Sequence, residues 1–249
     1  MIGSYDIKDP SGQEDGSEFK VRIFTRNTKS PAKILLNRYA MIFMSGFNNA
    51  PWDIYEFNFT PEKAVREFTE SVLIAINLGG ALITVAQGRT PAGFSIVSSL
   101  DSFSQDLKKI AGYKRRPRDY KSPTRYFKTL SQISGVPQDA FGKIGYIEEV
   151  AVDRKFQGKG YGKILIQSSI KFLKDKGKKY ILAWTVNPIM AGILSGEGFK
   201  HIKGIGDKGE GIDCLVDNGI WFPTLVIPPK HRIKQPDESI AALHYFKEL

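Results

Sequence analysis

The chain has 249 residues, 41% of them hydrophobic, which is enough apolar material for a sizeable buried core. No apolar run approaches the roughly 20 residues that a membrane span needs, and the polar first residues do not resemble a signal peptide. The single cysteine, Cys214, excludes intrachain disulfide bonds, and the three histidines are too scattered for a zinc site. We therefore expect a cytoplasmic protein with no bound metal.

The net charge of +10 is concentrated in two basic stretches, residues 108–128 and 154–179. The second stretch surrounds a glycine-rich segment, where positive potential would raise the capture rate of a polyanionic ligand. A solvated basic face would also account for most of these side chains. Binding of nucleic acid through residues 108–128 is an alternative, but charge alone is not specific enough to make nucleic acid the expected partner.

The first part of the chain predicts one strand, two helices and then two strands. The expected elements are a flexible polar arm (1–18), a strand (19–25), a helix (30–44), a helix (60–78) and strands (81–87 and 92–100). The second helix has the clearest start, because Thr60 is a good cap and Pro61 suits the first helical position. Gly79 and Gly80 end it.

Residues 101–143 interrupt this pattern of predicted strands and helices. The stretch is basic, contains Pro117, Pro123 and Pro137, and shows little periodicity. It lacks the apolar residues for a core of its own, so we interpret it as an insertion in a single domain spanning residues 19–249. A lid over the site, a contact for an acidic partner and an ordinary surface excursion are all open interpretations.

From residue 144 the pattern of strands and helices becomes sharper. The expected elements are a strand (144–152), a glycine loop (157–163) opening a helix, a strand (180–186), a short helix (187–196), strands (199–205 and 220–227) and a final helix (237–249). The final helix is predicted from Ile240, Leu243 and Phe246, which would form its apolar side. We expect an α/β protein with a mixed sheet.

The glycine loop is the most informative motif. Residues 157–163 read Gln-Gly-Lys-Gly-Tyr-Gly-Lys directly after an apolar strand. Glycines let the backbone approach a ligand, and amides at a helix start bind anions such as pyrophosphate. Lys163 stands where a dinucleotide fingerprint needs its third glycine, and Gln157 and Ile164 break the P-loop pattern. A glycine-rich turn without a ligand is the remaining alternative.

This loop and the strand before it strongly resemble the acetyl-CoA loop of the GCN5-related N-acetyltransferases, the GNAT superfamily. The resemblance spans about residues 19–227 and is specific only at 144–199. It implies a curved mixed sheet with helices on both faces, in which the fourth and fifth strands splay apart around the pantetheine arm. It also implies that acetyl-CoA is the cosubstrate. The residues that it assigns to cofactor binding are Val150, Ala151, Val152, Gln157, Gly158, Lys159, Gly160, Tyr161, Gly162, Lys163 and Asn187.

Acetyl transfer to an amine also needs a base, since an alkylammonium has a pKa of about 10. The candidates are Glu148, Glu149 and Tyr146, on or beside the cofactor strand. Side chains alternate along a strand, so Tyr146 and Glu148 should share one face and Glu149 the other. Related enzymes place an acid or histidine at the positions of Tyr146 or Glu148, and we favour Glu148. A glutamate that merely points to solvent or pairs with a lysine is the alternative.

Three features bear on the remaining chemistry. Leu194 stands where the family often has a tyrosine that protonates the leaving thiolate, so the acid would be water, Ser195 or a tyrosine such as Tyr146. Asn187 would either bind pantetheine or substrate, or simply cap the helix that Pro188 begins. The aromatic residues of segment 52–59 lie where the family builds its acceptor pocket; they are Trp52, Tyr55, Phe57 and Phe59.

The sequence therefore predicts an acetyl-CoA-dependent N-acetyltransferase that transfers acetyl directly to an amine in a ternary complex. The acceptor would be a small molecule or a peptide, and the enzyme a monomer or homodimer without a membrane partner. The alternatives are a regulatory acyl-CoA-binding module that has lost catalysis, as Leu194 would allow, a transferase for longer acyl groups, and the nucleic-acid-associated protein named above.

Overall fold

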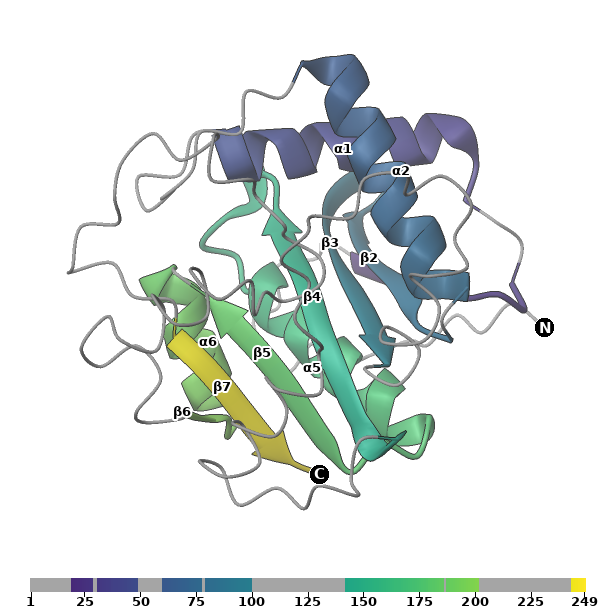
Figure 1. The fold of residues 1–249 in the computed structure, drawn as a ribbon. Coiled ribbons are helices and arrows are strands. Elements are labelled where there is room, and N and C mark those ends of the chain that lie inside the picture. The colour runs from purple at the N-terminus through teal and green to yellow at the C-terminus, as the bar shows by residue number, and fades with distance from the viewer. Residues whose placement is uncertain are drawn as a thin grey trace, which may run out of the picture. The chain divides into compact units, whose positions relative to one another are not determined.

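The computed structural model describes residues 19–28, 31–48, 60–77, 79–99, 142–185, 187–201 and 243–249 (Figure 1). Four predicted features lie wholly or almost wholly outside these residues: the arm, the aromatic segment 52–59, the insertion and the strand at 220–227. The described residues fall into two compact units, and strand β4 contributes to both. The single-domain organisation stays a prediction.

The first unit contains an antiparallel sheet covered by three helices. Its strands are β1 (Phe19–Phe24), β2 (Ala81–Gln87), β3 (Thr90–Ser99, up to Ser98) and β4 (Ile144–Val152, from Ile147), in the order β1-β2-β3-β4. Its helices are α1 (Lys33–Asn48), α2 (Pro61–Asn77) and α5 (Tyr161–Asp175, up to Phe172). The predicted strands and helices of this part of the chain are therefore confirmed, with small shifts at their ends.

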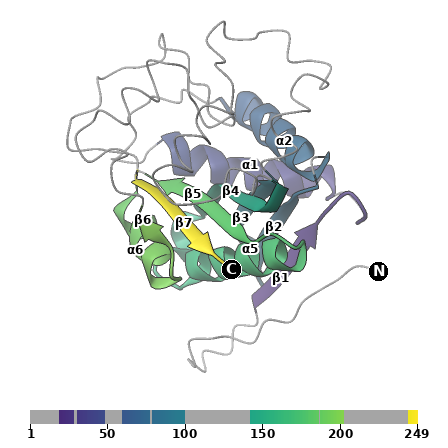
Figure 2. The same ribbon diagram turned by 60° about the horizontal axis from the view of Figure 1, so that its bottom comes forward.

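The two faces of this sheet are packed differently (Figure 2). On one face α1 and α2 enclose an aromatic core, in which the ring centroids of Phe68 and Phe94 lie 4.8 Å apart. Burial of each such ring contributes about 1.5–3 kcal/mol. On the other face lies α5, whose Ser169 hydroxyl donates to Ser95 of β3 over 2.9 Å. Both faces of β3 are thus closed to solvent.

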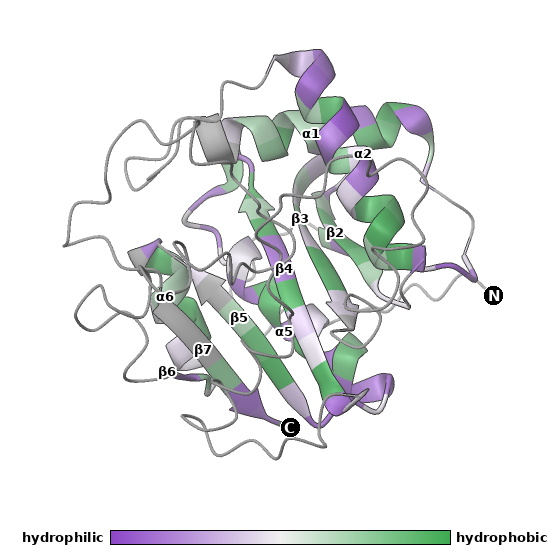
Figure 3. Cartoon of the chain, viewed as in Figure 1, coloured by the Kyte–Doolittle hydropathy of each residue, from purple (hydrophilic) through white to green (hydrophobic). Residues whose placement is uncertain are grey.

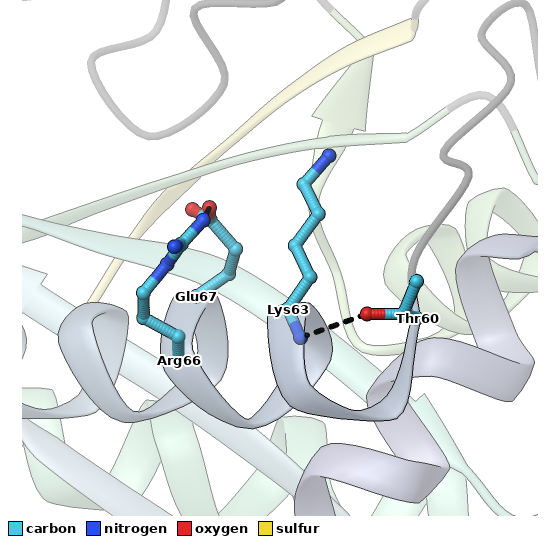
Figure 4. A network of polar contacts seen from close by, with 4 residues as sticks. All are labelled: Thr60, Lys63, Arg66 and Glu67. Carbon is cyan, nitrogen blue, oxygen red and sulfur yellow. Dashed lines mark hydrogen bonds and ion pairs between the residues drawn. The ribbon is translucent and has the colours of Figure 1, made fainter.

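Helix α2 begins as its sequence predicts. The Lys63 amide donates to the Thr60 hydroxyl over 3.3 Å, so Thr60 caps the helix (Figure 4). Phe68 and Val72 lie in the core, and Val65 and Ile76 pack against it. The helix ends before Gly79, whose φ of 82° is a conformation that glycine adopts without strain.

The second unit includes the first residues of β4. Ile144–Tyr146 pair in parallel with β5 (Tyr180–Thr185), and the strand order is β4-β5-β7-β6. Here β6 is Lys200–His201 and β7 is Leu243–Glu248, while α6 (Pro188–Gly196) is the predicted short helix. The parallel pairing spans Ile144↔Tyr180 to Tyr146↔Leu182, which is consistent with strands that diverge beyond it.

The predicted final helix over residues 237–249 is wrong. Residues Leu243–Glu248 form β7, which pairs antiparallel with β5 from Tyr180↔Glu248 to Thr185↔Leu243 and also pairs with β6. The Phe246 ring stacks on Tyr180 at 5.4 Å between centroids. A few apolar residues at helical spacing do not outweigh the backbone hydrogen bonds to strands on both sides and this cross-strand ring contact.

Among the described residues, no helix has the length and apolar character required to cross a bilayer.

The close approach of β3 to the end of β4 depends on Gly93. A Cβ at this position would lie 2.7 Å from the Ala151 carbonyl oxygen and 3.1 Å from Leu165 Cδ1. We expect Gly93→Ala to lower the free energy of unfolding by about 1–3 kcal/mol, because backbone must move to admit the methyl group. Denaturant unfolding measures this loss.

The matched control is Gly192→Ala in α6, where a Cβ meets nothing within 4 Å. This substitution should leave stability unchanged or raise it by about 0.5–1 kcal/mol, since alanine favours helix over glycine. A Gly93→Ala variant as stable as the parent would contradict the proposed steric role.

Candidate active site

Strand β4 leads directly into the glycine loop, and hydrogen bonds hold the junction between them. The Asp153 amide donates to the Ala92 carbonyl of β3 over 2.8 Å, which ties the end of β4 to the sheet. The Asp153 carboxylate accepts from the Lys155 amide over 2.9 Å, and the Gln157 side chain donates to the Val152 carbonyl over 3.2 Å. These hydrogen bonds therefore fix the path of the backbone from the end of β4 into the loop.

The glycine loop has the conformation that its sequence predicts. Gly158 and Gly160 have φ of 77° and 80°, in the left-handed region that other residues enter only at a cost. Helix α5 starts at Tyr161, so Gly162 and Lys163 belong to its first turn rather than to the loop. Amides in the first turn of a helix have no acceptor within the helix, which makes this turn suitable for an anion.

Side chains around the loop brace it and supply positive charge. The Tyr161 ring is buried and meets Phe156 edge-on at 5.9 Å and Phe19 at 6.5 Å between centroids. Lys159 Nζ lies 5.6 Å from the Phe156 ring centre. The Lys155, Lys159 and Lys163 side chains are exposed. The contacts of the Tyr161 ring thus help to fix the loop, while the three lysine side chains are open to solvent.

Two adjacent carboxyl groups lie buried on β4 before this junction. Only 8% of Glu148 and 5% of Glu149 is exposed, and Figure 3 shows the hydrophilic segment on an otherwise largely hydrophobic strand. Among the described residues, neither carboxyl oxygen of Glu148 makes a hydrogen bond, and Oε2 of Glu149 makes none. Unsatisfied buried polar atoms are rare in folded proteins and often mark a functional site.

Burial shifts the acid-base behaviour of both groups. It raises the pKa of Glu148 to about 7, partly opposed by the nearby Ser98 hydroxyl of β3, although no hydrogen bond of ordinary geometry joins the two. The pKa of Glu149 rises to about 8, first through burial and then through the like charge of Glu148. Ser71 on α2 lowers that pKa, and the Glu67 carboxylate raises it further. Glu148 is thus poised near neutral pH.

Two further predicted site residues, Tyr146 and Asn187, belong to the second unit. Tyr146 is completely buried on β4, beside Leu182 of β5 in the register. The Asn187 side-chain oxygen accepts from the amides of Ile189 and Met190 over 2.9 and 3.4 Å, so it caps α6. This capping role agrees with the simpler of its two interpretations, and a role in cofactor binding stays a prediction. Leu194 is 1% exposed and fills the core.

The sequence did not indicate the polar neighbours of the two glutamates. Glu67 and Ser71 lie one turn apart on α2, and Ser98 lies near the end of β3. Helical spacing places Glu67 and Ser71 on one flank of α2, but the strand opposite that flank is set only by tertiary packing. Among the described residues, no group of three His, Cys, Asp or Glu side chains has the arrangement to hold a metal ion.

The sequence matches the Acetyltransferase (GNAT) family over residues 49–190, more than half of the chain. No match was found among curated protein sequences. Three solved structures share the fold at low sequence identity, and the probability of each structural match is 1.00. A mosquito arylalkylamine N-acetyltransferase like 5b is 14% identical with a TM-score of 0.57, covering 93% of this chain and 100% of its own.

The second is an N-acetyltransferase from Staphylococcus aureus Mu50, 14% identical with a TM-score of 0.50, covering 92% of this chain and 98% of its own. The third is a ribosomal-protein-alanine N-acetyltransferase from Brucella melitensis, 12% identical with a TM-score of 0.51. The match covers 89% of this chain and 98% of the Brucella chain. These likenesses confirm the predicted mixed α/β fold.

The buried glutamates should make stability depend on pH. Their folded-state pKa values lie above the ordinary 4.5, so the folded state holds more protons than the unfolded state between pH 4.5 and about 8. The contribution of the two protonated carboxyl groups to the free energy of unfolding is complete below pH 4.5. It is lost as the pH rises through 7 to 8. For Glu148 the loss is on the order of 3 kcal/mol.

Unfolding by denaturant at pH 5 and pH 9 measures this effect. We expect Glu148→Gln and Glu149→Gln each to reduce the loss between the two pH values, because glutamine cannot ionise. Glu70→Gln, at an exposed position of α2, should behave as the parent. Equal pH slopes for the parent and both buried-site variants would show that the two carboxyl groups do not ionise at unusual pH.

Proposed function

Because the chain belongs to the GNAT family of acetyltransferases, we propose that it transfers acetyl from acetyl-CoA directly to an amine, in a ternary complex. Acetyl-CoA is the acyl donor of this family. The observation that carries the proposal is the buried Glu148, with no hydrogen bond from the described residues, on the strand that leads into the glycine loop. This observation supports a candidate base on the strand that precedes a candidate phosphate-binding turn.

The donor would be held mainly by backbone. In this proposal the backbone groups of Val150, Ala151 and Val152 bind the pantetheine arm and the thioester. The amides from Gln157 to Lys163 bind the diphosphate. The left-handed glycines of the loop and the exposed lysines around it support this assignment. Asn187 would contribute through its amide nitrogen, since its oxygen caps α6.

Glu148 would act as the base. The amine nitrogen attacks the thioester carbonyl, the carbon–sulfur bond breaks and coenzyme A leaves as a thiolate. The amine loses a proton to Glu148, directly or through water, and a base with a pKa of about 7 matches neutral operating conditions. Glu149 is the second candidate for this role. The thiolate would take its proton from water, from Ser195 or from a tyrosine such as Tyr146, because Leu194 cannot donate one.

One observation favours a second function, an acyl-CoA-binding module with little catalysis. Leu194 is buried in the core of the second unit where the family often carries the tyrosine acid. Binding of acetyl-CoA without turnover on a broad panel of amines would select this alternative.

We further propose a cytoplasmic location, which the single cysteine supports. We also propose that the acceptor is a small molecule or a peptide and that the enzyme is a monomer or a homodimer.

The role of Glu148 is tested by the pH dependence of kcat/KM. The parent enzyme should gain activity as the pH rises through about 7, because the base must be ionised. Glu148→Gln should lower kcat by about 10²–10⁴-fold and remove this limb of the profile. Glu62→Gln, in the exposed first turn of α2, is the control and should match the parent. An unchanged kcat and profile in Glu148→Gln would assign the base elsewhere.

The role of the glycine loop is tested by Gly160→Ala. Alanine is strained at a φ of 80°, by about 1–2 kcal/mol, so the loop should leave its binding conformation. We expect the Kd for acetyl-CoA, measured by calorimetry, to rise about tenfold or more. Gly177→Ala is the matched control, since Gly177 also has a positive φ of 74° and open space for a Cβ, but follows α5.

Gly177→Ala should lose a similar amount of stability and keep the affinity for acetyl-CoA. If both variants keep the parental affinity, the loop is a glycine-rich turn that binds no cofactor.

A further inference from the structure

The start of β1 and the start of the glycine loop lie at the same end of the sheet in the first unit. Phe19, the first residue of β1, pairs with Gln87 of β2, and Gln87 pairs with Thr90 at the start of β3. Two residues along β3, the Ala92 carbonyl accepts from the Asp153 amide, which directly follows β4. The arm, residues 1–18, therefore joins the sheet at the end from which the loop leaves it.

A ring contact links the start of β1 to the loop itself. The Phe19 ring meets the Tyr161 ring edge-on at 6.5 Å between centroids, and Tyr161 begins α5 directly after Gly160. A chain spans at most about 3.6 Å per residue, so the Cα atoms of Asp15 and Phe19 are at most roughly 14 Å apart. Covalent connection alone thus keeps the last residues of the arm in the neighbourhood of the loop.

The arm and the surface around the loop carry opposite charges. Four cationic side chains around the loop are exposed, and we call them the basic surface; they are Arg154, Lys155, Lys159 and Lys163. The arm has five acidic residues and one lysine; they are Asp6, Asp9, Glu14, Asp15, Glu18 and Lys8. Opposite charges attract within about one Debye length, roughly 8 Å at physiological salt. The chain therefore carries an acidic segment that is tethered beside a cationic surface.

The tether makes a weak contact sufficient. An exposed ion pair contributes little, so a free acidic peptide would bind this surface poorly. A short connection, however, holds a segment at an effective concentration in the millimolar range, so that even weak contacts become substantially occupied. A ligand of higher charge density can still displace such a contact.

We propose that the arm binds the basic surface of its own chain and competes there with acetyl-CoA. The inference rests on the proposed function, because the assignment of the loop to the donor diphosphate is what makes the two anions rivals. The arm lowers the fraction of molecules open to the donor and raises the apparent Kd accordingly. Binding of the donor displaces the arm, and the chemistry at Glu148 is unchanged. The arm is thus an autoinhibitory segment that a high donor concentration overcomes.

Carbodiimide cross-linking of the full chain tests the contact without the cofactor. The reagent joins a carboxyl group directly to an amine in contact with it, and mass spectrometry identifies the joined peptides. We expect cross-links from the arm to Lys155, Lys159 or Lys163, and we expect them to disappear at about 1 M salt, where the Debye length is about 3 Å. Lys33, exposed at the start of α1, is the reference lysine.

Two results would overturn the contact. Cross-links of the arm that reach Lys33 as often as the basic surface would show that the arm has no preferred site. Cross-links that join labelled to unlabelled chains, in a mixture of protein grown with and without nitrogen-15, would place the arm on a second copy instead of on its own chain.

The competition is tested in the full chain by neutralising three acids of the arm together, as Asp9→Asn, Glu14→Gln and Asp15→Asn. We expect the Kd for acetyl-CoA, measured by calorimetry at low salt, to fall about three- to tenfold, because the arm then no longer covers most molecules. At about 1 M salt the variant and the parent should have the same Kd. Thermal unfolding checks that the variant is as stable as the parent.

The matched control neutralises three acids outside the arm, as Glu62→Gln, Glu70→Gln and Glu248→Gln, at exposed positions of α2 and β7. It changes the net charge by the same amount and should keep the parental Kd. An equal change of Kd in both variants would reduce the effect to net charge and overturn the competition. An unchanged Kd in the arm variant would do the same.

The two experiments separate this inference from the proposed function. If acetyl-CoA does not bind but the arm cross-links to the basic surface, the assignment of the loop to the donor fails and the contact of the arm stands. If acetyl-CoA binds and neither experiment detects the arm, the arm has no regulatory role and the proposed function is unaffected.

Discussion

The burial of two adjacent carboxyl groups on β4 is the constraint on which the site depends. The packing of α1 and α2 on one face of the first unit, and of α5 on the other, excludes water from the sheet. That exclusion raises the pKa of Glu148 and Glu149 toward neutrality. The aromatic core therefore does more than stabilise the fold, since the same packing determines the protonation of the groups proposed to handle the amine.

The neighbouring glycine loop contributes chemistry of a different kind. Its side chains organise the turn, through Asp153, Gln157 and the Phe156–Tyr161 contact, whereas the cofactor binding proposed for it would use main-chain amides. Amides carry no charge that varies with pH, so donor binding should be insensitive to the titration of the carboxyl groups. In this proposal the first unit holds an acid-base region on β4 and a cofactor-binding region after it, and different physical interactions support each.

The sequence predicted the elements with strong local signals. Thr60 and Pro61 marked the start of α2, Asn187 and Pro188 that of α6, and the glycine loop followed its strand as expected. The predicted final helix was wrong, because Leu243 and Phe246 suit a helix or a strand equally and the neighbours β5 and β6 decided the outcome. Glu67 and Ser71 were not foreseen for a related reason: their proximity to Glu149 is a product of long-range packing.

The position of β7 has a consequence for how the protein folds. Strands β2 and β3 meet through a two-residue turn at Gly88 and Arg89, so their hairpin can form within microseconds. The ladder between β5 and β7 must instead close a loop of roughly 60 residues before its first hydrogen bond forms. The second unit is thus expected to reach its native pairing later than this hairpin, leaving the edge of β5 transiently open to pairing with other chains.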